Sequence, residues 1–179
     1  MKEHIEKIKA KYDAFEQFLL QNGQLLAKDT GIGFWGVTHL DNLHELFQRL
    51  NLNDHKHLID LGSGDGRVVL LASLFGIKAT GVEFDDWLLN TSLDMKRKLN
   101  LPTSKNITFL KDDFMGMDLS SYDLIYISPD KPFHRGLERK LKKELTGKLV
   151  VQSYEFHPKN LNLERDWTIN GQKFSIYTK

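Results

Sequence analysis

The sequence predicts a single α/β domain whose sheet is mostly parallel, and two patterns support this prediction. From residue 57 to residue 154, short apolar runs typical of strands alternate with amphipathic runs typical of helices, as in a parallel sheet with helices on both faces. Three glycines at alternate positions, Gly62, Gly64 and Gly66, follow the first of these apolar runs and precede a helical run. We therefore expect a Rossmann-like, doubly wound sheet with a glycine loop after its first strand.

Residues 1–50 form an N-terminal helical extension to this core. Apolar residues recur there at intervals of three and four and predict a helix over residues 3–27, which we expect to pack against the domain rather than to bind a partner or a membrane surface. A second helix is predicted over residues 41–50. Between them, residues 31–38 place aromatic residues among glycines, which indicates either a functional loop or an apolar plug over the core. The apolar residues of the first helix are Ile5, Ile8, Tyr12, Phe15 and Leu19.

Residues 51–179 form the core and complete one domain of residues 1–179. The end of the core does not continue the alternation of strands and helices. Residues 167–170 and 173–177 are instead typical of two strands joined by a tight turn at Gly171 and Gln172. This pattern predicts a C-terminal antiparallel hairpin. The other strands are expected at residues 57–61, 79–83, 107–110, 122–127 and 148–154, and the core helices at residues 66–75, 85–99 and 135–145.

Composition excludes several kinds of site. The 179 residues include no cysteine, so disulfides, thiolate metal sites and a cysteine nucleophile are excluded. The seven histidines are not spaced as metal ligands, and we expect no metal site. A net charge of +1 argues against a strongly basic binder of nucleic acid, although one face can still be basic. Without a spanning apolar run or a signal-type N-terminus, we expect a cytoplasmic protein that does not enter membranes.

The glycine loop, DLGSGDG, favours one class of nucleoside cofactor over another. The dinucleotide fingerprint spaces its glycines as GxGxxG and faces a pyrophosphate. Here the third glycine comes one residue early, and Arg67 stands where that fingerprint has a glycine. Asp60, Ser63 and Asp65 bring negative charge toward the site, which disfavours a pyrophosphate but suits the sulfonium and ammonium groups of S-adenosyl-L-methionine. The sequence therefore predicts S-adenosyl-L-methionine rather than NAD.

Further contacts to this cofactor are expected where the later strands end. Glu83, followed by Phe84, ends the second strand and can accept hydrogen bonds from both ribose hydroxyls. Residues 112–114 follow the third strand and offer an acceptor for the adenine amino group and an apolar neighbour for its ring. Ser128 follows the fourth strand at the same edge of the sheet. The predicted cofactor-binding residues are Asp60, Gly62, Ser63, Gly64, Asp65, Gly66, Glu83, Phe84, Asp112, Asp113, Phe114 and Ser128.

These motifs give residues 35–178 a resemblance to the class I, seven-stranded S-adenosylmethionine-dependent methyltransferases. Residues 60–66 match the first motif of that class, Glu83 the acid of the second strand, residues 112–114 the adenine motif and residues 123–130 the fourth motif. Within the class, the chain is similar to small archaeal protein-lysine methyltransferases and to the ATP-synthase c-subunit lysine methyltransferase group. This similarity rests on the segments DLGSGDGRVV, GVE, FWGVTH and GKLVVQSYEF and on Trp87. The resemblance implies an enzyme whose substrate is a protein with an accessible lysine.

Methyl transfer to a lysine amine requires alignment of the two reacting groups and removal of a proton from the amine. The catalytic residues that we predict are Asp130 as proton acceptor, Ser128 with its backbone carbonyl, and Trp35 as a wall of the acceptor site. Tyr154 and Phe156 are further candidates for such a wall. Asp130 can alternatively be a turn residue without a chemical role.

Two other functions are compatible with the sequence. The same cofactor could serve an RNA or small-molecule methyltransferase, and the basic run of residues 135–143 could follow RNA phosphates. That run lies on a predicted helix with Leu137, Leu141 and Leu145 at core spacing, which favours a solvated helix face. The segment SPDKPF also departs from the Asn/Asp/Ser-Pro-Pro-aromatic pattern of methyltransferases that act on base or glutamine nitrogens. A nucleotide-binding module without catalysis is the remaining, more remote alternative.

Overall fold

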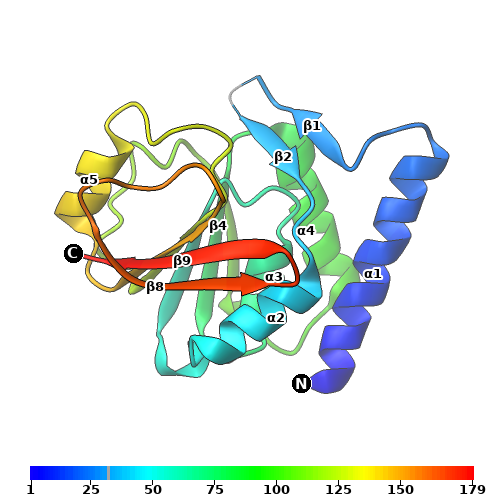
Figure 1. Cartoon of the computed structure of the whole chain (residues 1–179). Coiled ribbons are helices and arrows are strands. Elements are labelled where there is room, and N and C mark those ends of the chain that lie inside the picture. Colours follow the sequence, from blue (N-terminus) through cyan, green and yellow to red (C-terminus); the bar gives the residue numbers. More distant parts are fainter. Residues whose placement is uncertain (32) are drawn as a thin grey trace.

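A seven-stranded sheet in the order β5-β4-β3-β6-β7-β9-β8 forms the centre of the molecule (Figure 1). A computed structural model describes residues 1–31 and 33–179 of the chain. The strands β3 to β7 pair in parallel, and β9 pairs antiparallel with both β7 and β8, so the predicted parallel sheet with a C-terminal hairpin is confirmed. The strands are β3 His57–Leu61, β4 Lys78–Glu83, β5 Ile107–Lys111, β6 Leu124–Ile127, β7 Lys148–Gln152, β8 Asn162–Ile169 and β9 Gln172–Thr178.

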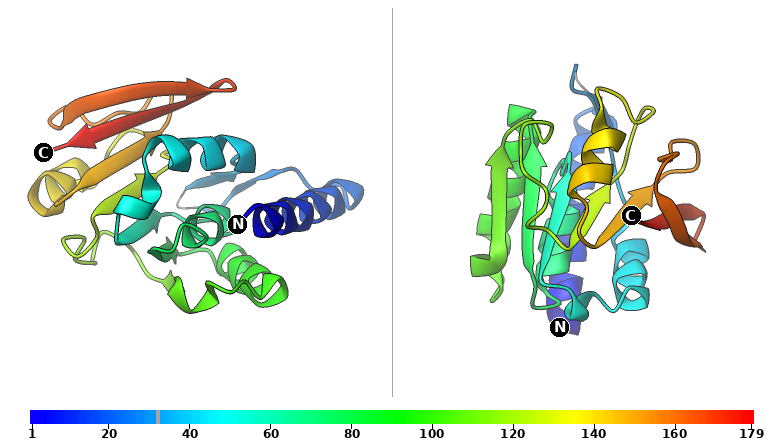
Figure 2. Two further views of the ribbon diagram at one scale, coloured as in Figure 1. Left: turned by 90° about the horizontal axis from the view of Figure 1, so that it is seen from below. Right: turned by 90° about the vertical axis from the view of Figure 1, so that its left-hand side faces the viewer.

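Helices cover both faces of this sheet. Leu58 packs in one core cluster with residues of α1, α2, α3 and α4, whereas its neighbour Ile59 packs in a second cluster with α5. This alternation follows from the two-residue period of a strand. The left view of Figure 2 shows α5 on one side of the sheet and α1 and α2 on the other. The helices are α1 Lys2–Gln21, α2 Leu40–Arg49, α3 Arg67–Ser73, α4 Asp86–Leu99 and α5 Leu137–Glu144, with short 3-10 turns η1 Leu52–Asp54 and η2 Ser104–Asn106.

The N-terminal extension differs in part from its prediction. Helix α1 buries four of the five residues of its predicted apolar stripe and half-buries Phe15, but it ends at Gln21 and not at residue 27. Gly23 ends it, because this residue has a φ of 71° and donates its N–H back to the carbonyl of Leu20. Among the described residues, no helix is long and apolar enough to cross a membrane.

A two-stranded hairpin follows α1, where the sequence predicted the end of a helix and a loop. Strand β1, Ala27–Asp29, pairs antiparallel with β2, Phe34–Gly36. Ile32, which belongs to the predicted loop of residues 31–38, lies outside the described residues. The hairpin stands over the edge of the main sheet where the parallel strands end (Figure 1). Trp35 is buried below it, whereas Phe34 is 57% exposed.

The remaining helices and the parallel strands begin and end within two residues of their predicted positions. The C-terminal hairpin is longer than predicted, because β8 begins at Asn162. Its turn lies one residue earlier than predicted, at Asn170 and Gly171, since Ile169 pairs with Gln172. Both turn residues have positive φ, 43° and 78°, as a two-residue type I′ turn requires.

Candidate functional site

The loop between β3 and α3 has a conformation that depends on its glycines. Gly62, Gly64 and Gly66 all have positive φ, at 78°, 53° and 84°. A Cβ on Gly64 would lie 2.6 Å from Cδ1 of Trp35, and a Cβ on Gly66 would lie 2.7 Å from Cζ of Phe109. The glycine loop therefore combines an unusual backbone with close packing, and other residues cannot take these positions without strain.

Glu83 fastens this loop to the end of the neighbouring strand β4. Its Oε2 accepts the N–H of Gly64 at 2.8 Å, and its Oε1 accepts the N–H groups of Phe84 and Asp85 at 2.9 and 2.8 Å. The side chain is 7% exposed and lines the cleft described below. Oε1 already accepts two N–H groups and Oε2 accepts one, so Oε2 keeps a lone pair with which Glu83 can still accept a ligand hydroxyl. The contact of Glu83 with a ribose stays a prediction. Its hydrogen bond to the glycine loop was not predicted from the sequence.

Asp60 carries a buried carboxylate that lacks a partner. The residue is 3% exposed, and within the described parts of the chain no hydrogen-bond donor contacts its side chain. Burial, and then the nearby charges of Glu83 and Asp65, raise the pKa of Asp60 well above its ordinary value. The residue lines a small cavity of about 60 Å³ together with Thr38 and Tyr126. An unpaired carboxylate in such a cavity is suited to a cation.

Ser63 and Asp65 also line this cavity, but their side chains are packed or paired within the protein. Asp65 is 1% exposed, and its carboxylate is held by the Arg67 guanidinium at 2.6 Å, which neutralises its charge. The Ser63 hydroxyl lies beneath the loop, because a Cβ on Gly81 of β4 would be 2.6 Å from its Oγ. The negative charge next to the glycine loop therefore comes from Asp60 and Glu83. Ligand contacts of Ser63 and Asp65 stay predictions.

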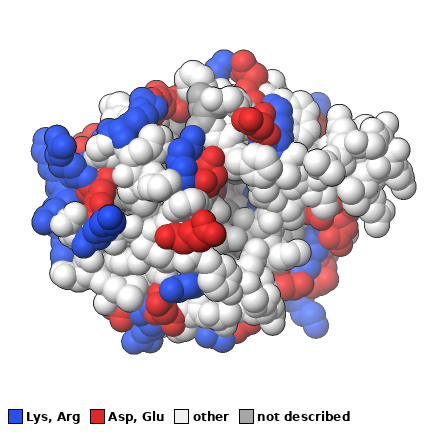
Figure 3. Space-filling model, turned by 45° about the horizontal axis from the view of Figure 1, so that its top comes forward, with Lys and Arg blue, Asp and Glu red and all other residues white. Residues whose placement is uncertain are grey.

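A cleft of about 310 Å³ lies at the carboxyl edge of the parallel strands. It is placed where the chain order switches from β3, β4 and β5 on one side to β6 and β7 on the other, the position at which open α/β sheets bind ligands. Figure 3 shows a hollow near the centre of this face, with charges of both signs around it. The predicted residues that line the cleft are Trp35, Gly62, Gly64, Glu83, Phe84, Asp112, Asp113, Phe114, Ser128 and Asp130.

The small cavity beside Asp60 adjoins this cleft, because Phe34, Trp35, Gly62, Gly64 and Ser128 line both. Three other predicted cofactor-binding residues, Asp60, Ser63 and Asp65, line only the smaller cavity. Gly66 lines neither space and is instead the N-cap residue of α3.

An ion pair lines the cleft beyond the end of β5. Asp113 accepts the N–H of Met115 at 3.0 Å, and Nη2 of Arg135 donates to it at 2.7 Å. These contacts, the backbone N–H of Met115 first, lower the pKa of Asp113. Arg135 belongs to the basic run, but Leu137 and Leu141 of α5 are buried as predicted for a helix packed on the core. An adenine contact of Asp113 would compete with this ion pair and stays a prediction.

The predicted catalytic residues Trp35, Ser128 and Asp130 all line the cleft. Asp130 approaches the hairpin, since a Cβ on Gly33 would lie 3.7 and 3.9 Å from its two carboxylate oxygens. Ser128 is exposed, and its Oγ is 3.5 Å from the Gln152 carbonyl. Trp35 packs edge-on against Trp87, with ring centroids 5.8 Å apart. These contacts place an acid, a strand end and an indole ring around one space.

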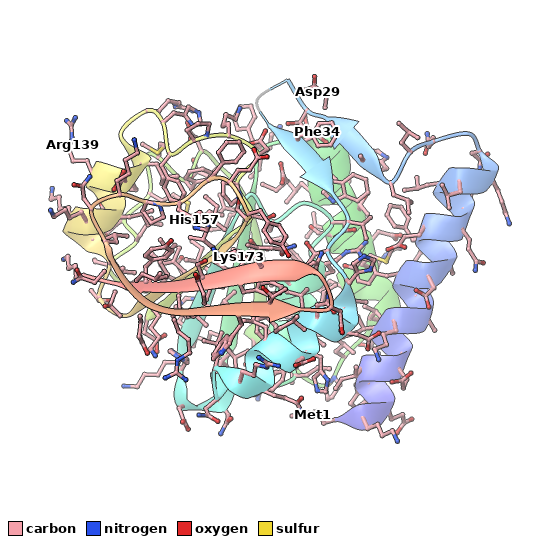
Figure 4. All side chains as sticks on the ribbon, viewed as in Figure 1. Met1, Asp29, Phe34, Arg139, His157 and Lys173 are labelled. Carbon is pink, nitrogen blue, oxygen red and sulfur yellow. The ribbon has the colours of Figure 1, made fainter. Side chains whose placement is uncertain are left out.

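Two other predicted wall residues are not part of this space. Tyr154 donates its hydroxyl to the Gly171 carbonyl at 3.0 Å, and neither Tyr154 nor Phe156 is among the described residues that line the cleft. Phe34 and Phe133 line it instead, and Figure 4 shows Phe34 on the hairpin above the sheet edge. The glycine and aromatic pattern of residues 31–38 was the signal that could have identified Phe34. No group of three or more potential metal ligands occurs within residues 1–31 and 33–179.

Comparison with known proteins identifies the family. The model of the ANTKMT methyltransferase domain matches residues 60–165, more than half of the chain. The chain belongs to this methyltransferase family. The match begins at Asp60 and includes the glycine loop, Glu83 and the residues around Asp130.

Relatives of this methyltransferase domain include named lysine methyltransferases. The chain is 38% identical over 77 residues to the ATP-synthase c-subunit lysine N-methyltransferase of Caenorhabditis elegans, covering 43% of this chain and 40% of that protein. It is 31% identical over 105 residues to a protein-lysine N-methyltransferase of Saccharolobus islandicus, covering 58% of this chain and 64% of that protein. The matched region thus spans less than half the length of the Caenorhabditis elegans relative.

Solved structures share the fold at lower identity. An RNA methyltransferase from Salinibacter ruber, in complex with S-adenosyl-L-homocysteine, matches with a TM-score of 0.64 and 19% identity, covering 79% of this chain and 92% of that chain. A tRNA (uracil-54, C5)-methyltransferase from Pyrococcus abyssi matches with a TM-score of 0.65 and 12% identity, covering 82% of this chain and 40% of that chain. These likenesses support the Rossmann-like methyltransferase fold of the chain.

Proposed function

We propose that the chain is an S-adenosyl-L-methionine-dependent methyltransferase that N-methylates lysine side chains of protein substrates. The observation that carries this proposal is the family match, because it begins at Asp60 and includes all the cleft residues except those of the β1–β2 hairpin region. The names of the relatives from Caenorhabditis elegans and Saccharolobus islandicus support lysine as the acceptor.

The residues present fit this cofactor. The unpaired carboxylate of Asp60 lies in a small cavity that can receive a cationic group, and the cofactor carries an ammonium and a sulfonium. Glu83 lines the adjoining cleft, and its Oε2 retains a lone pair for a ribose hydroxyl. Phe114 and Leu137 line the same cleft and provide apolar contacts for a base. The two spaces share the glycine loop, so one elongated ligand can occupy both.

S-adenosyl-L-methionine supplies an activated methyl group whose leaving group is a neutral thioether. The chain must align the lysine nitrogen with that methyl group and exclude water from the gap. In this proposal Asp130, which lines the cleft close to Gly33, accepts the proton that the lysine ammonium loses before its nitrogen attacks. Trp35 packs on Gly64 and forms an apolar wall of the reaction space.

Calorimetric titration with S-adenosyl-L-homocysteine tests the cofactor, with NAD as the control ligand. We expect binding of S-adenosyl-L-homocysteine and none of NAD. The opposite result would overturn the cofactor assignment.

A second experiment tests the acceptor. A cell lysate is incubated with the enzyme and methyl-labelled cofactor, and the product is divided between protease and nuclease treatment. We expect protease, and not nuclease, to release the label. Release by nuclease alone would identify an RNA acceptor and refute the lysine proposal.

A further inference from the structure

Arg67, the residue that departs from the dinucleotide fingerprint, lies at the centre of a buried network under the glycine loop. Its Nε is 3.0 and 3.1 Å from the two carboxylate oxygens of Asp65, and its Nη2 is 2.6 Å from Oδ2. Arg67 is 4% exposed, and the Asp65 side chain is 2% exposed. Asp65 stands between Gly64 and Gly66, so this pair fixes the middle of the loop.

The network extends from the loop to the N-terminal helix. Nη1 of Arg67 donates to Oε1 of Glu16 on α1 at 2.9 Å. Tyr12, one helical turn earlier, donates its hydroxyl to the Asp65 carbonyl at 2.7 Å, and its ring lies 4.6 Å from the guanidinium carbon. Tyr12 and Glu16 of α1 therefore contact the Arg67–Asp65 pair that holds the glycine loop.

The same guanidinium also reaches the segment after the β1–β2 hairpin. Nη1 of Arg67 donates to the Thr38 carbonyl at 2.9 Å. This segment follows Trp35, whose ring covers Gly64. One buried side chain thus connects α1, the glycine loop and the hairpin that lines the cleft.

Electrostatic interactions stabilise the contacts of Arg67 with Asp65, Tyr12 and Glu16. Burial alone would lower the pKa of Arg67, but the charge and hydrogen bonds of Asp65, followed by the contacts to Tyr12 and Glu16, raise it above its ordinary value. Removing one partner from a buried charge is costly. A loop with three glycines loses much conformational entropy when it becomes ordered, and external contacts that order it beforehand reduce the cost of binding a ligand.

We propose that α1 is a positioning element of the cofactor site, in which Glu16 and Tyr12 act through Arg67 and Asp65 to hold the glycine loop in its binding conformation. This inference rests on the proposed function. It goes beyond the family match, because α1 lies outside the matched residues 60–165.

The test compares substitutions on α1 of the full chain. Glu16→Ala removes the contact to Arg67, and Glu16→Gln keeps an acceptor oxygen in place. Tyr12→Phe removes only the hydroxyl. Glu6→Ala is the matched surface control, because Glu6 is an exposed residue of the same helix that contacts Lys9. Ile8→Val controls for stability, because Ile8 is buried in the core cluster and takes no part in the network.

Dissociation constants for S-adenosyl-L-homocysteine are measured by calorimetry well below each melting temperature. We expect roughly threefold to tenfold weaker binding for Glu16→Ala and Tyr12→Phe, in line with loss of one hydrogen bond. Glu16→Gln should restore most of the affinity, and both controls should bind as the wild type does. In the methylation assay, the cofactor KM should rise while kcat at saturating cofactor stays within about twofold.

The inference would be overturned by unchanged cofactor affinity in folded Glu16→Ala and Tyr12→Phe, even if their melting temperatures fall. It would also be overturned if Ile8→Val weakened binding as much as they do, because general loss of stability would then explain the effect. Failure of the wild type to bind S-adenosyl-L-homocysteine would overturn the proposed function, and the inference with it.

Discussion

Glu83→Ala should have two separable effects, because Glu83 both supports the glycine loop and faces the cleft. The substitution leaves the N–H of Gly64 without its partner beneath the loop. An unsatisfied buried donor costs about 1 to 3 kcal/mol, and we expect the free energy of unfolding to fall by that amount. Thermal or urea unfolding of the free protein measures this effect.

The second effect of Glu83→Ala concerns the ligand. Loss of a charged acceptor for the ribose should weaken binding by about 1.5 to 3 kcal/mol, which corresponds to roughly 10-fold to 150-fold in the dissociation constant. Titration with S-adenosyl-L-homocysteine measures it at a temperature where the variant is folded. Asp86→Ala is the control, because Asp86 is an exposed carboxylate of α4 paired with Lys111. A folded Glu83→Ala variant with wild-type affinity would refute the placement of the ribose at Glu83.

Three further substitutions test other parts of the site. Gly64→Ala should weaken cofactor binding at least tenfold, because the new Cβ would lie 2.6 Å from Trp35. The φ of 53° at this position also costs a non-glycine residue about 1 kcal/mol or more. Wild-type affinity of this variant in a titration would contradict the prediction. Asp130→Ala should lower kcat for lysine methylation more than it weakens cofactor binding, and the reverse pattern in steady-state kinetics would move Asp130 to the cofactor site. Asp60→Asn should raise the melting temperature of the free protein at neutral pH yet weaken cofactor binding, and a lower melting temperature with unchanged affinity would show that the carboxylate is not a free cation site.

The sign of the last prediction follows from the pKa of Asp60. Burial, then Glu83 and Asp65, raise this pKa in the folded protein above its value in the unfolded chain. The folded state therefore binds the proton more tightly, and ionising Asp60 costs folding free energy. This cost is absent at pH values below the unfolded pKa and is complete above the raised folded pKa. The difference in melting temperature between Asp60→Asn and wild type should accordingly grow as the pH rises through this window.

Much of the site could be predicted because it depends on local sequence. Positive φ at Gly62, Gly64 and Gly66 and the strand before them follow from residue types that are adjacent in the chain. Glu83 could be placed because parallel strands end at one edge of a sheet. Hydrophobic periodicity similarly located the strands and helices of the core.

What could not be predicted depends on contacts between distant segments. The three-residue strands β1 and β2 are too short for a periodic pattern and are defined by their pairing with each other. Arg67 was only a departure from a fingerprint in the sequence, because its partner Glu16 is 51 residues away. Asp65 was expected to face the ligand, and its pairing with Arg67 becomes evident only when the loop conformation is known.

Identification of the methylated amino acid tests the central claim most directly. The purified chain is incubated with methyl-labelled S-adenosyl-L-methionine and a protein extract, and the labelled proteins are hydrolysed to amino acids and separated. The account predicts that the label is recovered as N-methylated lysine, and that Asp130→Ala yields much less of it. Recovery of the label in another amino acid, or transfer only to RNA or small molecules, would contradict the assignment of a protein-lysine methyltransferase.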